Sequence, residues 1–431
     1  MGEIITKRIG RSHIAWFESS NSWIRFEEPA WLVFSMIQAG KGNLEISRKC
    51  QDTFGFSENE CDSFILDVKK RVGQLKKEKN IPPNGLMPGS SELPAINPYS
   101  VRYYTFGKIS FCIHYASRLL EYYIHSPLAH LETGASGPGN DRVSNSDDSR
   151  SPFKDFKTQS GDPSIAPTAP RSQMTVEEEF KLLEDPDSTL FLHCLKADKK
   201  YSFSEYGRLK MRMFIELTKL IHRMQDEDWM AIIHASAVTD GRQSILFAAD
   251  SGAGKSTLAT LLQSRDLKLI ADDFVPIDKD SGNAHPFPAA ASVKAAGRHV
   301  IEDYDPLLFL NAYSASGTES SPVYFLPPRH EMNAIPGPVP VRAIVFLKYN
   351  PNVPCNFSAL DPIIAIERIH EHAWVSKRAK DVRVLMDWLS DISFYEMEYS
   401  DTDRGMDQVE SLFNNQKEKE VQTKQANHEA V

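Results

Sequence analysis

One segment, residues 244–264, constrains the fold more than any other part of the sequence. An apolar run at 244–248 is typical of a buried strand, and a helical pattern follows at 257–264. The turn between them reads Ala249-Asp250-Ser251-Gly252-Ala253-Gly254-Lys255-Ser256. Backbone N–H groups of such a turn can converge on a phosphate, and glycine permits the close approach. The segment therefore predicts an α/β domain with a polyphosphate-binding loop.

Two side chains at the end of the loop fit a metal–nucleotide complex. Lys255 offers a point charge for the β- and γ-phosphates, and Ser256 offers a hydroxyl to Mg²⁺. The following helix begins with Thr257, and its N-terminal dipole also favours anions. We therefore assign ATP binding to the loop residues through Thr257. The pattern G-x-x-x-x-G-K-[ST] has Ala249 at its first glycine, a small change if the φ angle there is not positive.

A pair of carboxylates follows the loop closely. A strand pattern at 267–271 ends in Asp272 and Asp273, 17 and 18 residues after Lys255. Such a pair can divide metal binding and proton acceptance between its members. A chance Gly-Lys-Ser turn would not explain this pair. The residues leave open which aspartate takes which role.

His234 lies in the apolar run 231–238, which we interpret as one strand. With a turn at 239–242, Val238 faces Gln243, and His234 falls opposite Phe247, near the loop. The alternative is a buried strand histidine bonded to the backbone.

The segments "H-A-S-A-V", "D-S-G-A-G-K-S" and "L-I-A-D-D" resemble the HPr kinase/phosphorylase catalytic domain and its phosphoenolpyruvate carboxykinase-like relatives. The resemblance implies a P-loop domain with a mixed sheet that uses ATP and Mg²⁺. It implies that Asp273 is the general base toward a serine, and that Asp272 and Ser256 hold the metal. It further implies that His234 and Lys255 contact the phosphates. Because such relatives are often oligomers, a homo-oligomer is a further expectation.

Four basic residues are weaker candidates for substrate or transition-state contacts, each with a surface charge as the alternative: Lys294, Arg298, Arg329 and Arg342. The family carries a further metal-binding glutamate, and the ungapped position here holds Arg298. That departure puts HPr itself as substrate, and the reverse phosphorylase reaction, in doubt.

The first segment, 10–76, has a different pattern. It predicts a strand at 22–26 and helices at 27–40, at 44–54 and from 57 onward, a small winged-helix-like module. The order "W-I-R-F-E-E-P-A-W-L-V-F", "L-E-I-S-R-K-C" and "F-G-F-S-E-N-E-C-D-S-F-I-L-D-V" resembles the PqqD-like peptide-recognition domain, which binds leader peptides. The alternative is a generic helical domain that packs on the rest.

Proline-rich and polar segments of the sequence indicate the remaining domain boundaries. A proline-rich linker is expected at 77–99, a catalytic domain at 100–410 with a disordered insertion at 134–173, and a flexible tail at 414–431. The net charge of −9 argues against a nucleic-acid partner. Five cysteines without a C-x-x-C spacing fit a reducing compartment. Without a secretory signal or a long apolar run, we expect a cytoplasmic protein with no membrane partner.

These features together predict an ATP-dependent kinase acting on a serine of a peptide or protein, with the substrate delivered by the first domain. Two alternatives stay open. The chain could be a nucleotide-gated, non-catalytic scaffold of a peptide-modification pathway, or it could be a small-molecule kinase.

Overall fold

A computed structural model describes residues 2–10, 12–77, 87, 92–95, 97–133, 176–309, 312–315, 322–329, 337–376 and 378–414. Most of the expected linker, the expected insertion at 134–173 and nearly all of the expected tail lie outside these residues. The chain forms two compact units, each described here by itself. Unit 1 comprises 1–84, 125–130 and 212–431, and unit 2 comprises 85–124 and 131–211.

The chain of unit 1 begins with a small α/β segment. Three antiparallel strands precede three helices: β1 (Ile4–Ile9), β2 (Ser12–Phe17), β3 (Ser22–Phe26), α1 (Glu28–Gln38), α2 (Asn43–Phe54) and α3 (Glu58–Lys77). The expected strand and helices are confirmed, whereas β1 and β2 were not expected. In β1 only Ile5 and Ile9 are buried, so the strand carries a weak apolar signal.

Ser57 and Glu60 explain why α3 begins where it does. The Ser57 hydroxyl and backbone N–H both donate to Oε2 of Glu60, at 2.7 and 2.8 Å. In return, the backbone N–H of Glu60 donates to the Ser57 hydroxyl at 3.4 Å, and this reciprocal cap satisfies donors that the first turn would otherwise leave unpaired. The helix then buries an apolar stripe against the aromatic core of the segment, which includes Phe17, Phe26 and Phe34.

A mixed ten-stranded sheet dominates unit 1, with the order β12-β10-β11-β18-β14-β13-β9-β20, and with β21 beside β18 and β19 beside β21. Its strands are β9 (Trp229–Ile233), β10 (Ala235–Thr239), β11 (Ser244–Ala248), β12 (Lys268–Ala271), β13 (Val275–Asp278), β14 (Asn283–Ala284), β18 (Val339–Tyr349), β19 (Cys355–Ala359), β20 (Ala373–Val375) and β21 (Ser393–Tyr399). The strands β9 to β11 are buried throughout, which explains their unbroken apolar sequences.

The directions of the strands bring the ends of β11 and β12 and the start of β10 to one edge of this sheet. β10 runs antiparallel to both β11 and β12, so β11 and β12 run in the same direction. The residues that follow these two strands therefore lie at the same edge. The start of β10 lies there too, because Ala235 pairs with Ala248. The loop at 249–254, the aspartates and His234 meet at this edge for that reason.

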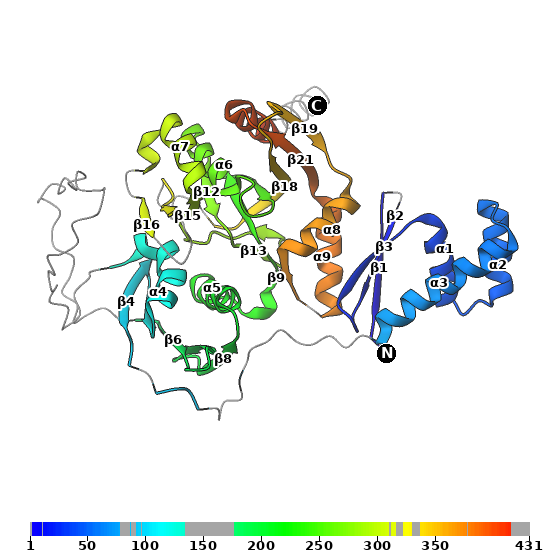
Figure 1. Ribbon diagram of the computed structural model, residues 1–431, viewed down its shortest axis with the longest axis horizontal. Coiled ribbons are helices and arrows are strands. Elements are labelled where there is room, and N and C mark those ends of the chain that lie inside the picture. Colours follow the sequence, from blue (N-terminus) through cyan, green and yellow to red (C-terminus); the bar gives the residue numbers. More distant parts are fainter. Residues whose placement is uncertain are drawn as a thin grey trace, which may run out of the picture. The chain divides into compact units, whose positions relative to one another are not determined.

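Two helices and a three-stranded sheet of order β15-β17-β16 flank the edge. Figure 1 shows α6 (Lys255–Leu261) beside α7 (Ala295–Tyr304), and both helices contact β15 (Ala291–Lys294). Gly297 allows the two helices to approach, because a Cβ there would lie 2.5 Å from Oγ1 of Thr257. The other strands of this sheet are β16 (Tyr313–Ala315) and β17 (Val323–Leu326).

The remaining described helices of unit 1 are α8 (Pro362–His372), α9 (Ala379–Asp391), a helix at 402–414, and the short 3₁₀ helices η1 (Ser126–Leu131), η3 (Asp226–Asp228), η4 (Leu262–Arg265) and η5 (Pro306–Phe309). The long helix expected at 206–224 is α5 (Tyr206–His222). None of the helices in the described ranges is long and apolar enough to cross a membrane.

Unit 2 is built on a five-stranded sheet of order β4-β5-β6-β7-β8. Its strands are β4 (Ser100–Phe106), β5 (Ile109–Tyr115), β6 (Glu178–Glu184), β7 (Leu190–Cys194) and β8 (Lys199–Phe203), and its helix is α4 (Arg118–His125). Only β5 and β6 pair in parallel. One face of the sheet buries Tyr104, Phe111 and Tyr115, and the hydroxyl oxygens of the two tyrosines lie 2.7 Å apart.

Candidate functional site

The loop between β11 and α6 contains two glycines with a left-handed backbone. Gly252 and Gly254 have φ angles of 91° and 95°, which only glycine adopts without strain. No heavy atom lies within 4 Å of a Cβ built on Gly252, so that side of the loop is open. Ala249 does not have a positive φ, and its methyl group packs into the core of the sheet. The alanine in place of the first glycine is therefore compatible with the loop.

Lys255 lies under the loop and only 7% of it is exposed. Its Nζ donates to the carbonyl oxygens of Ala249 and Asp250, at 2.6 and 3.3 Å. Burial lowers the pKa of Lys255, and the charges of Asp273 and Asp272 oppose that shift. The loop thus surrounds the Lys255 ammonium, which donates to two carbonyl oxygens of the loop.

Asp272 is buried at the centre of a group of serines. Oδ1 accepts from the Ser236 hydroxyl at 2.5 Å, and both carboxylate oxygens accept from the Ser256 hydroxyl at 2.9 Å. The backbone N–H of Ser292 donates to Oδ2 at 2.9 Å. Burial raises the pKa of Asp272, the adjacent Asp273 adds to the rise, and these hydrogen bonds oppose it. Ser256 and Asp272, the two expected metal ligands, are therefore in direct contact.

Asp273 faces a different partner. Its Oδ1 lies 3.1 Å from Nδ1 of His234, and 38% of each side chain is exposed. The φ angle of Asp273 is 66°, an unusual value for a residue with a side chain. The two adjacent aspartates thus differ in burial, in partner and in backbone conformation.

The expected register of the hairpin is wrong, because each residue of β10 pairs with a residue of β11 two positions later than expected. Ser236, and not His234, faces Phe247, and Thr239 faces Ser244. The run 231–238 is also two strands, because β9 pairs with β13 and β20, whereas β10 pairs with β11 and β12. His234 lies at the change of partners, where its N–H donates to the carbonyl of His372 at 2.7 Å. It nevertheless reaches Asp273 from that position.

The structure adds residues that the loop pattern did not indicate. Ser236 and Ser292 bind Asp272, and His372 at the end of α8 has its ring centroid 6.4 Å from that of His234. Nε2 of His372 lies 3.9 Å from Oδ1 of Asp250. A sequence signal existed for Ser236, which is two residues after His234. His372 is 117 positions beyond Lys255, and no local pattern links the two.

Of the four basic candidates, only Lys294 reaches the loop, where its Nζ donates to the Ser251 hydroxyl at 3.1 Å. Arg298 donates to Glu302 and to the Tyr324 hydroxyl, and its guanidinium lies over the Tyr324 ring. Arg329 binds Asp305. Arg342 lies beside the start of β11, at the end of the strand away from the loop.

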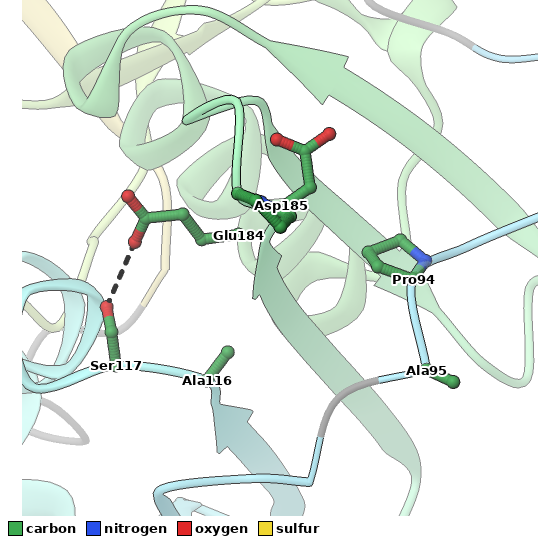
Figure 2. Close-up of a pocket in the computed structure, with 7 residues that line it drawn as sticks. Pro94, Ala95, Ala116, Ser117, Glu184 and Asp185 are labelled. Atoms are coloured by element: carbon green, nitrogen blue, oxygen red, sulfur yellow. Dashed lines mark hydrogen bonds between the residues drawn. The ribbon is translucent and has the colours of Figure 1, made fainter.

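Unit 2 has a hollow of its own, with a volume of about 550 Å³. Figure 2 shows Glu184 turned toward Ser117, whose hydroxyl donates to it at 3.3 Å, with Asp185 and Pro94 on the other sides. The Tyr206 hydroxyl also donates to Glu184, at 2.9 Å. None of the residues expected from the sequence to bind nucleotide lines this hollow.

Comparisons with known proteins add little to this geometry. No protein-family model matches the chain, and no curated protein matches it. Among solved structures, the chain is similar to the Hpr(Ser) kinase/phosphatase from Coxiella burnetii, with 11% sequence identity and a TM-score of 0.22. The match covers 46% of this chain and 96% of that one. The likeness of residues 10–76 to PqqD-like domains stays a prediction.

Proposed function

We propose that this chain is an ATP- and Mg²⁺-dependent phosphotransferase that acts on a serine hydroxyl of a peptide or protein. One observation carries the proposal: Asp272 binds the hydroxyl of Ser256, while the adjacent Asp273 turns to His234 at the same edge of the sheet. Phosphoryl transfer needs a held metal, a cation for the phosphates and a base for the attacking hydroxyl. The edge supplies a residue suited to each need.

The residues at the loop fit a metal–nucleotide complex. A hydroxyl and a carboxylate are the oxygen ligands that Mg²⁺ prefers, and Ser256 and Asp272 offer them in contact. The open side of Gly252 leaves space for phosphate oxygens beside the backbone N–H groups. Bound Mg²⁺-ATP would supply the phosphoryl group and neutralise part of its charge.

The surrounding side chains have separate tasks in this proposal. Lys255 leaves its loop carbonyls to contact the phosphates, and Lys294 adds a second cation from the side of Ser251. Asp273 accepts the proton of the substrate hydroxyl, because it is the more exposed of the two aspartates. His234 orients Asp273 through Nδ1. Ser236 and Ser292 keep Asp272 in place as a metal ligand.

The first segment of unit 1 is the proposed binding module for the peptide. In the sheet β1-β2-β3, no described strand pairs with the outer edge of β3. A groove of about 350 Å³ lies along α3, lined by Phe56, Glu60, Ser63, Phe64 and Asp67. A lining of aromatic and acidic side chains suits a peptide that carries apolar and basic residues. Binding there would raise the effective concentration of the acceptor serine.

Incubation of the full-length protein with γ-labelled ATP tests the proposal. Label should appear on serine of a peptide substrate, and the Asp273→Asn protein should transfer it roughly 10²–10⁴-fold more slowly. Label on a small molecule alone would favour a metabolite kinase. Nucleotide binding without transfer to any acceptor would favour a nucleotide-gated scaffold. Absence of nucleotide binding would reject the proposal altogether.

A further inference from the structure

A second group of chemically reactive side chains lies in unit 2, whereas the loop residues belong to unit 1. Cys112 and His114 are alternate residues of β5, so both point to the face of the sheet opposite Phe111 and Tyr115. Glu179 of β6 pairs directly with Cys112 in the parallel ladder. The face thus gathers a thiol, an imidazole and a carboxylate from two neighbouring strands.

The three side chains converge on one point. Nε2 of His114 lies 2.9 Å from Oε1 of Glu179 and 3.8 Å from Sγ of Cys112. All three candidate ligand atoms lie within 4.8 Å of one another. Around a tetrahedral zinc ion, Zn–S and Zn–N bonds of roughly 2.3 and 2.0 Å place neighbouring ligand atoms about 3.5 Å apart. The observed separations lie on both sides of this value, so shifts of the side chains alone can close the site.

We propose that Cys112, His114 and Glu179 bind one Zn²⁺ ion on this face of the unit 2 sheet. Sulfur, nitrogen and oxygen together suit zinc, whereas Mg²⁺ and Ca²⁺ take oxygen ligands. Three protein ligands leave a fourth position for water. Binding makes bonds from Sγ, Nε2 and a carboxylate oxygen to the ion, and the thiol proton passes to solvent.

Burial and charge around the group agree with an ion that enters from solvent. Cys112 is 4% exposed, while the side chains of His114 and Glu179 are 22% and 35% exposed. The thiolate and the carboxylate together balance a divalent charge. Two nearby cations would oppose binding: Lys181, which pairs with His114 in the ladder, and Lys196, whose ammonium donates to the carbonyl of Val176.

The position of the group suggests what the ion would do. β5 ends at Tyr115 and β6 begins at Glu178, so the ligands come from strands that are far apart in sequence. An ion bound by both strands would hold their parallel pairing and close a loop between residues 112 and 179. A ligand that binds only the folded state stabilises that state. Zinc is therefore expected to raise the melting temperature of the protein.

Cobalt absorption tests the site in the full-length protein. After treatment with a chelator, the protein is titrated with Co²⁺ in the presence of excess Mg²⁺, which competes for the oxygen ligands of the loop. We expect one equivalent of Co²⁺ with a thiolate-to-cobalt charge-transfer band, displaced by Zn²⁺. Cys112→Ser should abolish the band, and Cys355→Ser, a half-buried cysteine of unit 1, should keep it.

Two further measurements, both on the Glu179→Gln protein, test the zinc site if the Cys112→Ser protein folds poorly. Glu179→Gln retains the thiol and should weaken Zn²⁺ binding at least tenfold by calorimetry. The zinc-dependent rise in melting temperature should disappear in the same variant. A charge-transfer band that survives Cys112→Ser, or unchanged Zn²⁺ affinity in Glu179→Gln, would overturn the site. Neither result bears on nucleotide binding, because no loop residue is involved.

Discussion

Nδ1 of His234 lies 3.1 Å from Oδ1 of Asp273, an aspartate whose φ angle is 66°. The left-handed backbone turns this carboxylate toward the histidine, while the preceding Asp272 stays buried among serines. Strained backbone angles of this kind persist where surrounding contacts fix them, and they cluster at functional sites. The relationship separates two adjacent carboxylates into an accessible one and an enclosed one.

Substitution of the two aspartates should have different effects. Asp273→Asn should keep Mg²⁺-ATP binding and lose phosphoryl transfer by roughly 10²–10⁴-fold, the usual contribution of a general base. Asp272→Asn should instead weaken the dependence of nucleotide binding on Mg²⁺, because it removes a charged metal ligand. Calorimetry with and without Mg²⁺, beside a transfer assay, distinguishes the two. Equal loss of nucleotide affinity in both variants would contradict this division.

Lys255 should be replaced by methionine and not by alanine, because it is buried. Only 7% of Lys255 is exposed, so truncation to alanine would also remove buried packing. Lys255→Met keeps most of the aliphatic stem and removes the ammonium. Loss of a charge-assisted contact worth about 1.5–3 kcal/mol predicts roughly 10- to 150-fold weaker ATP binding. Unchanged affinity, measured by calorimetry on folded protein, would reject the phosphate role of Lys255.

Gly252 and Gly254 form a matched pair for a test of the loop. Both have positive φ, so alanine is strained at either position, by roughly 1–2 kcal/mol. A Cβ on Gly254 would also lie 2.9 Å from the Tyr399 hydroxyl, whereas one on Gly252 meets nothing within 4 Å. Gly254→Ala should therefore lower the melting temperature more than Gly252→Ala. Tyr399→Phe should recover part of the difference in the double variant, and no recovery would show that the hydroxyl is not the obstacle.

Local segments of the fold were predictable from the sequence where a pattern had clear ends. The strand β11 and the helices α1 to α3 follow from apolar runs, a glycine-rich turn and the Ser57–Glu60 cap. The division of 231–238 into β9 and β10 was not predictable, because a buried apolar run has no period that marks a change of partner. The hairpin register was wrong for another reason: the turn lies at 240–243, one residue later than expected, so that Thr239 pairs with Ser244.

The charged residues of the site were predictable from the sequence, whereas the residues that contact and position them were not. Lys255 and the aspartates lie within 18 residues, so one motif contains them all. The contacts of Ser292 with Asp272 and of His372 with His234 join residues that are 20 and 138 positions apart. Such contacts depend on the direction of strands in the sheet, which a single sequence does not state.

His222 should make the protein less stable in mild acid. Burial lowers its pKa from 6.5 to about 4, and the nearby His285 adds to the shift. The unfolded chain therefore takes up a proton below pH 6.5 that the folded state refuses until about pH 4, so stability falls as pH falls through this window. The loss is about 2 kcal/mol between pH 7 and pH 5, at 1.36 kcal/mol per pH unit.

Denaturant titrations of His222→Gln at both pH values check this expectation. Glutamine can donate to the Pro286 carbonyl, as the histidine ring nitrogen does at 2.9 Å, but does not titrate. The variant should lose less stability than the wild-type protein on acidification. Equal losses would mean that other groups cause the acid sensitivity.

The groove on α3 offers a test of substrate recruitment that leaves the chain intact. Asp67 lines the groove, and Asp62 is an exposed residue of the same helix outside it. If a basic peptide segment binds there, Asp67→Lys should raise KM for a long peptide substrate with little change in kcat, and Asp62→Lys should not. A short peptide that carries only the acceptor serine should respond to neither variant, because it gains nothing from tethering. The contrast depends on charge at one position and not on the stability of the helix, since both substitutions are at exposed sites. Identical kinetics for the two variants with the long peptide would show that the first segment does not recruit substrate through this groove.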